Sequence, residues 1–116
     1  MENVVVSKSF KFSVRIYKLS RYLMDKKHEY ELAKQLLRSG TSIGANLHEA
    51  QYAQSVNDFI SKNSIALKEA AETEYWLDLL HEVELLTNKE YQSIRNDCSE
   101  LAKLLTAIVK TTKQKK

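Results

Sequence analysis

Apolar residues recur along most of the chain at steps of three and four, the spacing that places side chains on one face of an α-helix. Between residues 9 and 27 this face consists of Phe12, Ile16, Leu19 and Leu23. A second apolar stripe follows roughly the opposite side of the same segment, with Phe10, Val14, Tyr17 and Met24. A helix that is apolar on two sides needs two neighbours. We therefore expect this helix to take part in self-association.

The same spacing predicts three more helices. The segment 30–52 has an apolar seam of Leu32, Leu36, Ile43, Leu47 and Ala50. The segment from residue 55 to about 86 has a stripe of mostly small residues, Phe59, Asn63, Ala66, Ala70, Thr73 and Leu77. The segment 88–112 has Tyr91, Ile94, Cys98, Leu101, Leu105, Ile108 and Thr112. Capping boxes, Ser55 with Asp58 and Thr87 with Glu90, mark the start of the third and fourth helices.

Long helices joined by short connections pack as antiparallel neighbours. The chain has no Pro and two Gly, which leaves little turn chemistry for a strand-rich fold. The sequence therefore predicts an all-α protein, an antiparallel up-down-up-down four-helix bundle over residues 9–112. Residues 1–8 are expected to form an N-terminal arm, and residues 113–116 a basic C-terminal tail.

The segment 38–50, RSGTSIGANLHEA, combines small residues with polar and charged ones. Gly40 and Gly44 each cost ~1 kcal/mol relative to Ala in a helix, so a close packing contact must offset that cost. Beside its apolar seam runs a polar one, formed by Gln35, Ser39, Ser42, Asn46 and Glu49. We expect this polar seam to meet Glu69 and Glu72 of the third helix, with Arg38 as their counter-ion. Such a buried polar layer would fix the register between two helices.

The formal net charge is +3, which permits contact with nucleic acid without requiring it. Four cations lie at helical spacing on the first predicted helix, without acids interspersed among them: Lys8, Lys11, Arg15 and Lys18. Cations in a row can follow a phosphate backbone and give salt-dependent, sequence-tolerant binding. The sequence thus offers a surface for RNA or DNA. A plain solvated helix face is the alternative, and no recognised nucleic-acid-binding motif decides between them.

Catalytic chemistry has little support. A ferritin-like di-metal site joins Glu from two helices with Glu-x-x-His from two others. The nearest match here is Asp78-x-x-His81, which occurs once. A metal-dependent enzyme that uses Glu49, Glu69 and Glu72 stays as a minor alternative. Trp76 is interpreted as a residue that anchors the core or a subunit interface. We expect no catalytic residue, no metal and no cofactor.

The single cysteine, Cys98, cannot form an intramolecular disulfide, so a reducing compartment is the expectation. The N-terminus lacks the apolar stretch of a signal peptide, and no segment approaches the ~18 apolar residues of a spanning helix. We therefore expect a cytoplasmic protein without a membrane partner.

Three stretches resemble the four-helix-bundle family of 23S rRNA intervening-sequence proteins: SFKFSVRIYKL, QLLRSGTSIGANLHEA and DFISKNSIALKEAAETEYWLDLL. The resemblance implies a left-handed antiparallel bundle that assembles into a homopentamer, with no established molecular function. The family is also similar to accessory proteins of diversity-generating retroelements, whose basic pentamers bind nucleic acid. Its older naming as ribosomal protein-like does not imply ribosome membership.

By position, eight residues fall on the signature of that family: Arg38, Ser39, Ser42, Asn46, Glu49, Glu69, Glu72 and Trp76. The resemblance implies roles in packing and assembly for them. The leading hypothesis is therefore a non-catalytic oligomeric protein that binds nucleic acid through its basic surface. The alternative is a structural or protein–protein interaction scaffold that binds no nucleic acid.

Overall fold

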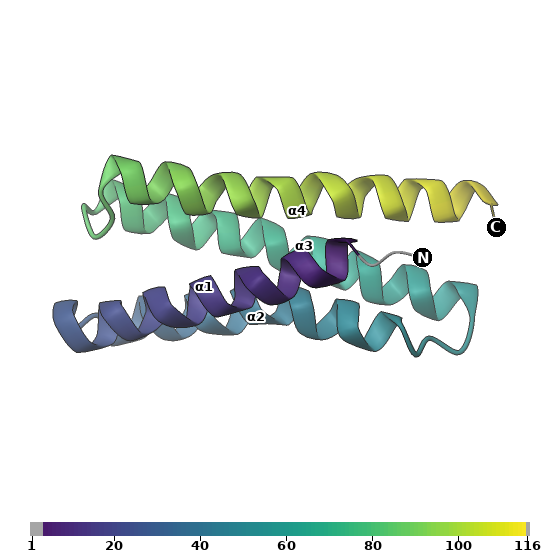
Figure 1. The fold of residues 1–116 in the computed structure, drawn as a ribbon, viewed down its shortest axis with the longest axis horizontal. Helices are drawn as coiled ribbons and strands as arrows, with labels where there is room; N and C mark the ends of the chain where they lie inside the picture. Colours follow the sequence, from purple (N-terminus) through teal and green to yellow (C-terminus); the bar gives the residue numbers. More distant parts are fainter. Residues whose placement is uncertain (1–3, 116) are drawn as a thin grey trace.

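The computed structural model describes residues 4–115, and these form four helices and no strand. The helices are α1 (Val4–Lys27), α2 (Tyr30–Ala50), α3 (Val56–Glu82) and α4 (Asn88–Lys115). They lie side by side in an elongated bundle of 46 × 21 × 20 Å, and the chain reverses direction at each connection (Figure 1). The predicted all-α helical bundle is confirmed. The arrangement is consistent with an up-down-up-down order, while the left-handed twist stays a prediction.

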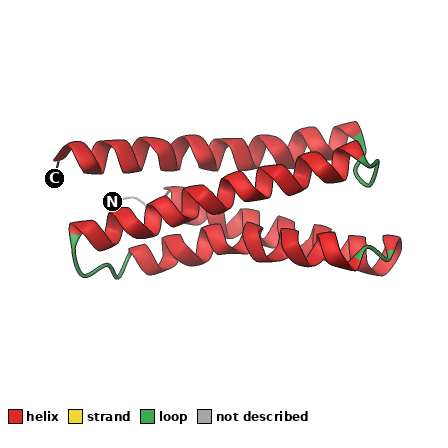
Figure 2. Cartoon of the chain, turned by 180° about the vertical axis from the view of Figure 1, so that it is seen from behind, coloured by secondary structure: helices red, strands yellow, loops and turns green. Residues whose placement is uncertain are grey.

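Short loops join the helices, so nearly all of the described backbone is helical (Figure 2). The first helix begins at Val4, five residues before the predicted start, so residues 4–8 are helical and not an extended arm. Val5 and Val6 pack against the core, and this burial outweighs the weak helix propensity of β-branched residues. The fourth helix continues to Lys115, through most of the expected tail. Residues 1–3 and 116 lie outside the described part of the chain.

The predicted capping box at α4 is complete, whereas at α3 only the bond to Ser55 is formed and the Asp58 carboxylate accepts from the N–H of Gln54 at 3.2 Å. The Ser55 Oγ accepts a hydrogen bond from the backbone N–H of Asp58 at 3.0 Å and caps α3. The Thr87 Oγ1 accepts from the N–H of Glu90 at 3.1 Å, and the Glu90 carboxylate accepts from the N–H of Thr87 at 3.0 Å. Each bond satisfies a backbone donor that the first turn of a helix leaves free. These local signals therefore place the starts of α3 and α4 correctly.

The third helix ends four residues before the predicted end at residue 86. Glu84 adopts the left-handed conformation, with φ of 64°, and turns the chain out of the helix. The N–H of Leu85 donates to the carbonyl of Leu80 at 2.9 Å, and the N–H of Glu84 donates to that of His81 at 3.0 Å. This pair of bonds is a Schellman motif. It ends the helix while Leu85 still packs against the core.

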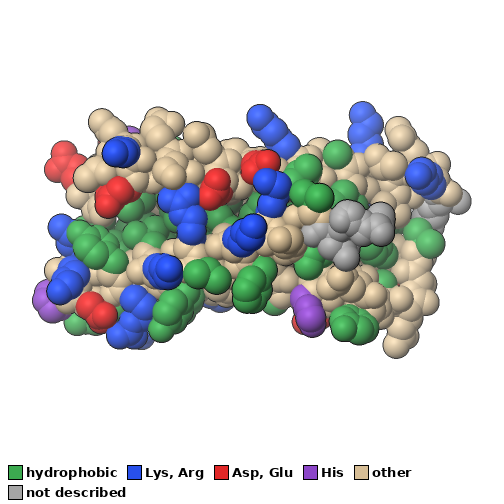
Figure 3. Space-filling view, in the orientation of Figure 1, with side chains coloured by type: hydrophobic (Ala, Val, Ile, Leu, Met, Phe, Trp, Pro, Cys, Tyr) green, Lys and Arg blue, Asp and Glu red, His purple; other side chains and the backbone are tan. Residues whose placement is uncertain are grey.

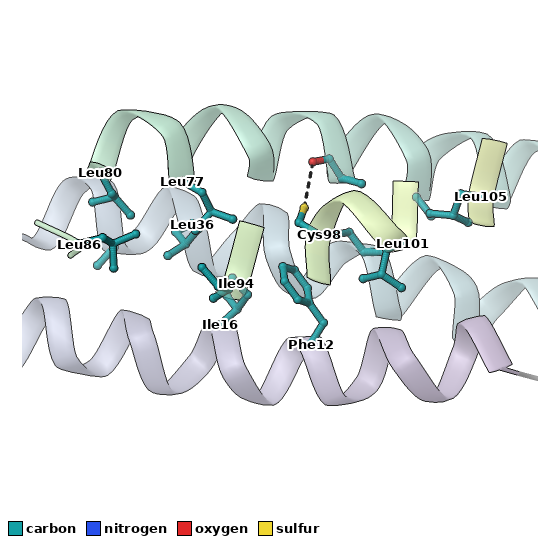
Figure 4. Packing of buried hydrophobic residues seen from close by; sticks show 14 of the residues in the cluster. Phe12, Ile16, Leu36, Leu77, Leu80, Leu86, Ile94, Cys98, Leu101 and Leu105 are labelled. Atoms are coloured by element: carbon teal, nitrogen blue, oxygen red, sulfur yellow. Dashed lines mark hydrogen bonds between the residues drawn. The ribbon is translucent and has the colours of Figure 1, made fainter. Parts of the chain in front are cut away.

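The core runs the length of the bundle and takes side chains from all four helices (Figure 4). Its largest fully buried apolar members are Ile16, Leu23, Leu36, Ile43, Leu47, Leu77, Leu80, Leu101 and Leu105. The Cys98 side chain lies in this core, where its thiol donates to the Ala70 carbonyl at 3.5 Å. The predicted apolar seams therefore form the interior.

The two glycines of α2 face α1. A Cβ atom at Gly40 would lie 2.8 Å from the Cγ1 and from the Cγ2 of Ile16. One at Gly44 would lie 3.1 Å from the Ser13 Oγ and 3.3 Å from the Ser9 carbonyl oxygen. All four distances are shorter than ordinary van der Waals contact. The close packing that the sequence required of these glycines is thus the contact between α1 and α2.

Candidate functional site

The four cations of the predicted basic stripe lie along α1, on the side of the bundle that faces α4. Lys8 forms an ion pair with Glu100 of α4 at 3.2 Å. Arg15 pairs with Asp97 of α4 at 2.7 Å and donates a second hydrogen bond to the Ser93 Oγ at 3.0 Å. Two of the four cations of the stripe are therefore paired with carboxylates of α4. Figure 3 shows Lys and Arg side chains on this face with acidic side chains among them.

The other two cations of the stripe, Lys11 and Lys18, form no ion pair within the described part of the chain, although Lys11 lines the same hollow as Asp97 and Glu100. Among residues 4–115, neither Lys11 nor Lys18 has a carboxylate within ion-pair distance, and both are exposed. The spacing of residues along α1 does not reveal the acids that α4 supplies across the contact, Asp97 and Glu100. A cation that is already paired with a carboxylate attracts an external anion less strongly than an unpaired cation does. Lys11 and Lys18 are thus the two cations of the stripe that no ion pair with a described residue neutralises.

The second apolar stripe of α1 lies on the surface of the single chain. Phe10 is 70% exposed, Tyr17 is 54% exposed and Val14 is 41% exposed. Met24, expected in the same stripe, instead packs partly buried against the core. Large apolar side chains exposed in a row are unusual on a monomer and mark interaction surfaces. We call Phe10, Val14 and Tyr17 the outer stripe of α1.

A polar cluster joins α2 to α3 at the position that the sequence predicted. The Arg38 Nη1 donates to the Glu69 Oε1 at 3.3 Å, and its Nη2 donates to the Glu72 carboxylate. The same Glu72 carboxylate accepts from the indole N–H of Trp76 at 2.9 Å. Trp76 packs partly buried against the core, with the ring of Tyr75 edge-on at 5.0 Å. The predicted partners of Arg38 are therefore correct.

The expected burial of this cluster is wrong for the single chain. The side chain of Arg38 is 50% exposed and that of Glu72 is 34% exposed. Desolvating charges is costly, and at the rim between two helices the groups keep part of their hydration. A role of this cluster in assembly stays a prediction.

The remaining residues of the predicted polar seam have other partners. The Asn46 amide donates to the backbone carbonyl of Ser42 at 2.8 Å, within α2 itself. Glu49 is mostly exposed and pairs with Lys62 of α3 at 2.9 Å, a hydrogen bond that raises the pKa of the Lys62 amine. The seam residue that does reach a buried polar partner is Ser39. The Thr73 Oγ1 of α3 donates to its hydroxyl at 2.9 Å, and both residues are fully buried.

A second polar network, which the sequence analysis missed, joins α3 to α4. Arg95 donates through Nε to the Asp78 carboxylate at 2.8 Å and pairs through Nη1 with Glu74 at 2.8 Å. The Tyr91 hydroxyl donates to Asp78 at 2.6 Å. The bond from Arg95 holds the pKa of Asp78 below its ordinary value, with Tyr91 contributing, and the same partner raises the pKa of Arg95. The carboxylate is therefore kept ionised by its neighbours.

His81 belongs to the same face of the bundle. Its ring stacks on that of Tyr91 at a centroid distance of 4.1 Å and an angle of 5°. Its Nε2 lies 2.6 Å from the Asn88 Oδ1. Asp78 and His81, the nearest sequence match to a di-metal motif, are thus both engaged in the contact between α3 and α4. Over residues 4–115 no three His, Cys, Asp or Glu side chains are grouped as metal ligands would be.

Within the same described range, none of the helices has the length and apolar character needed to cross a membrane.

Comparison with known proteins places the chain in a family. The model of the family described as 23S rRNA-intervening sequence protein matches residues 1–107. A similar solved structure, at 1.70 Å, is of a protein of unknown function from the S23 ribosomal protein family of Bacteroides thetaiotaomicron VPI-5482. The two are 56% identical and superpose with a TM-score of 0.92, over 93% of this chain and 96% of that one. No curated protein matches the chain. Since the family model spans nearly the whole sequence, this protein belongs to the 23S rRNA-intervening sequence protein family.

Proposed function

We propose that the protein is a non-catalytic homo-oligomer that binds RNA or DNA through cations of α1. One observation carries the proposal: the outer stripe of α1 is exposed, and it is bordered by Lys11 and Lys18, the two cations of the basic stripe that have no acidic partner among residues 4–115. Lys11 follows Phe10 and Lys18 follows Tyr17, so each lysine lies about 100° around the helix from the stripe. One helix can therefore supply both an apolar contact and a basic edge.

The apolar part of the argument favours a second copy of the chain. Phe10, Val14 and Tyr17 occupy successive turns of α1, and the core of the single chain does not cover them. Aromatic residues are enriched at protein interfaces, where burying each of them stabilises the complex. Assembly would bring several copies of Lys11 and Lys18 onto one particle. Repeated cations strengthen binding to a polyanion, since each neutralised phosphate releases counterions.

Assembly is tested by multi-angle light scattering on the purified protein at micromolar concentration. We expect an oligomer, and we expect a double substitution, Phe10→Asp with Tyr17→Asp, to reduce it to a monomer without loss of helical circular dichroism. A matched control places the same charges on other exposed aromatics, Tyr30→Asp with Tyr52→Asp, and should leave the oligomer intact. A monomeric wild-type protein would contradict the assembly.

Nucleic-acid binding is tested by the retention of structured RNA and of duplex DNA as salt is raised. We expect binding at low salt that weakens steeply, and a further loss in the variant Lys11→Glu with Lys18→Glu. The control, Lys34→Glu with Lys68→Glu, changes the net charge equally on α2 and α3, and its binding should stay closer to that of wild type. Arg15 is left in place because its reversal would set a carboxylate against Asp97 and weaken the contact between α1 and α4.

The scaffold alternative rests on the same outer stripe without the cations. It predicts an oligomer that copurifies free of nucleic acid and does not retain RNA or DNA even at low salt. The ultraviolet absorbance spectrum of the purified protein shows whether nucleic acid copurifies, and so distinguishes the nucleic-acid-binding hypothesis from the scaffold hypothesis. Equal binding by the two charge-reversed variants would remove Lys11 and Lys18 from the proposed interface.

A further inference from the structure

An apolar groove opens at the end of the bundle where α1 begins and α4 ends. It encloses about 500 Å³, and its lining includes Val5, Leu47, Phe59, Asn63, Ala107 and Ile108. All four helices contribute to it, so the fold shapes it from several sides. We call it the end groove.

The end groove lies where the described part of α1 begins, at the end of the bundle that also holds the last turns of α4 (Figures 1 and 2). Phe59 and Ile108, which line it, are only partly buried, although both lie on the apolar seams of their helices.

One buried polar atom is available inside the end groove. Asn63 is 1% exposed, and its amide nitrogen donates to the Phe59 carbonyl at 2.9 Å, which leaves Oδ1 without a donor from residues 4–115. Among these residues, Ser20 Oγ alone is a fully enclosed side-chain polar atom without a partner. The Asn63 oxygen therefore keeps an opening to the groove that its residue lines. A hydroxyl or N–H group of a bound molecule could donate to this oxygen from the groove.

The lining also carries no ionisable side chain: its polar members are amides and hydroxyls. An ionised ligand would lose its hydration there without gaining a counter-ion. The volume is typical of small-molecule sites, which are mostly apolar with a few placed polar groups. At the ~30 Å³ that a water molecule takes in the liquid, it holds roughly seventeen heavy atoms.

We propose that the end groove binds a neutral, largely aliphatic small molecule whose hydroxyl or N–H group donates a hydrogen bond to the Asn63 Oδ1. The proposal is independent of the outer stripe and of nucleic-acid binding, because none of the residues involved in those lines the groove. The aliphatic chain would lie against Val5, Leu47 and Ile108. The hydrogen bond would fix its polar end at the floor of the groove.

The test uses 1-octanol as the probe and heptyl methyl ether as its match, since both have nine heavy atoms but only the alcohol donates a hydrogen bond. Methyl-resolved NMR titration of the full chain is expected to show saturable shifts at Val5, Leu47 and Ile108 with 1-octanol. The ether should bind several-fold to about tenfold more weakly, the ratio that one hydrogen bond to a buried acceptor gives. No saturable shift with 1-octanol would overturn the proposal.

Three variants test the location of the binding site. Ala107 is exposed and borders the groove, so Ala107→Phe should fill it and abolish the binding while the chain stays folded. The control, Ala71→Phe, adds the same ring at an exposed position of α3 outside the groove and should bind as wild type does. Undiminished binding by Ala107→Phe would contradict the site. Asn63→Ala should bind the alcohol and the ether equally, and a preserved preference for the alcohol would exclude Asn63 as the acceptor.

Discussion

Gly40 of α2 lies directly against Ile16 of α1, so that a single added carbon on Gly40 would come within 2.8 Å of two side-chain carbons of Ile16. Both residues are fully buried, which means that Ile16 cannot rotate away into solvent. The contact sets how closely α1 and α2 approach each other. It also explains why a helix of this length keeps a residue that disfavours helix formation.

Gly40→Ala is therefore expected to destabilise the protein, although alanine is the better helix former by ~1 kcal/mol. Overpacking a core typically costs about 1–3 kcal/mol, which exceeds that gain. Urea unfolding should show a net loss of about 1 kcal/mol. Gly44→Ala meets a longer contact, 3.1 Å to the Ser13 Oγ, and should lose less.

The cause of this loss can be checked with a double-mutant cycle. Ile16→Ala removes the two carbons that the new Cβ would meet at 2.8 Å and leaves only the Ile16 Cβ at 3.2 Å, so the double variant should be more stable than the sum of the two single changes implies. Full additivity, or a Gly40→Ala protein as stable as wild type, would rule out the steric explanation.

The features that the sequence predicts best are local. Thr87 and Glu90 lie three residues apart, and their capping bonds depend on nothing outside that turn. The start of α1 was placed too late because valine is a weak helix former, and the packing of Val5 and Val6 against the core is not visible in the spacing. The end of α3 at Glu84 is not predictable from the sequence either, because glycine is the residue that usually adopts the left-handed conformation at a helix end.

The candidate site shows the same division. The contacts of Arg38 with Glu69 and Glu72 were predictable because these residues lie on polar faces of α2 and α3. Polar faces of adjacent helices tend to lie against each other. The ion pair of Arg15 with Asp97 joins residues 82 positions apart, and nothing in the pattern fixes which turn of α4 faces α1. The pairing of Asp78 with Arg95 was missed for the same reason. The burial and the relative positions of these ion-paired residues are set only when the four helices pack together.

Replacing Arg38 by methionine should lower stability modestly, because the Arg38 side chain is half exposed and its ion pairs are partly screened. We expect a loss of about 0.5–1 kcal/mol in urea unfolding. The emission of Trp76 should also change, since its indole shares the Glu72 carboxylate with Arg38. An Arg38→Met protein that is equally stable and assembles normally would show that the cluster does not set the register of α2 on α3.

The contact between Asp78 and Arg95 predicts a pH dependence. The pKa of Asp78 is lower in the folded protein than its ordinary value, so the stabilisation is present above that ordinary value, near pH ~4. It is lost as the pH falls through the lower folded pKa. Asp78→Asn should therefore cost about 1 kcal/mol at neutral pH, after allowance for solvent screening, and progressively less in acid.

The measurement is urea unfolding of wild type and Asp78→Asn from neutral pH into the acid range. As a control, Asp25→Asn removes the exposed pair with Arg21 on a single helix and should change stability little at any pH. A stability difference between wild type and Asp78→Asn that stays constant with pH would contradict the proposed ionic contact.

Cys98 is expected to be chemically silent in the folded protein. Burial, with a smaller contribution from Glu74, raises the pKa of its thiol to about 12, and the side chain has no exposed surface. Because the thiolate is the reactive form, a disulfide reagent such as dithiobis(nitrobenzoic acid) should label it only after unfolding in urea. A Cys98→Ala protein carrying Asn96→Cys, on the exposed side of the same helix, should be labelled at once while folded. Rapid stoichiometric labelling of folded wild type would mean that α4 opens away from Ala70 far more readily than its packing implies.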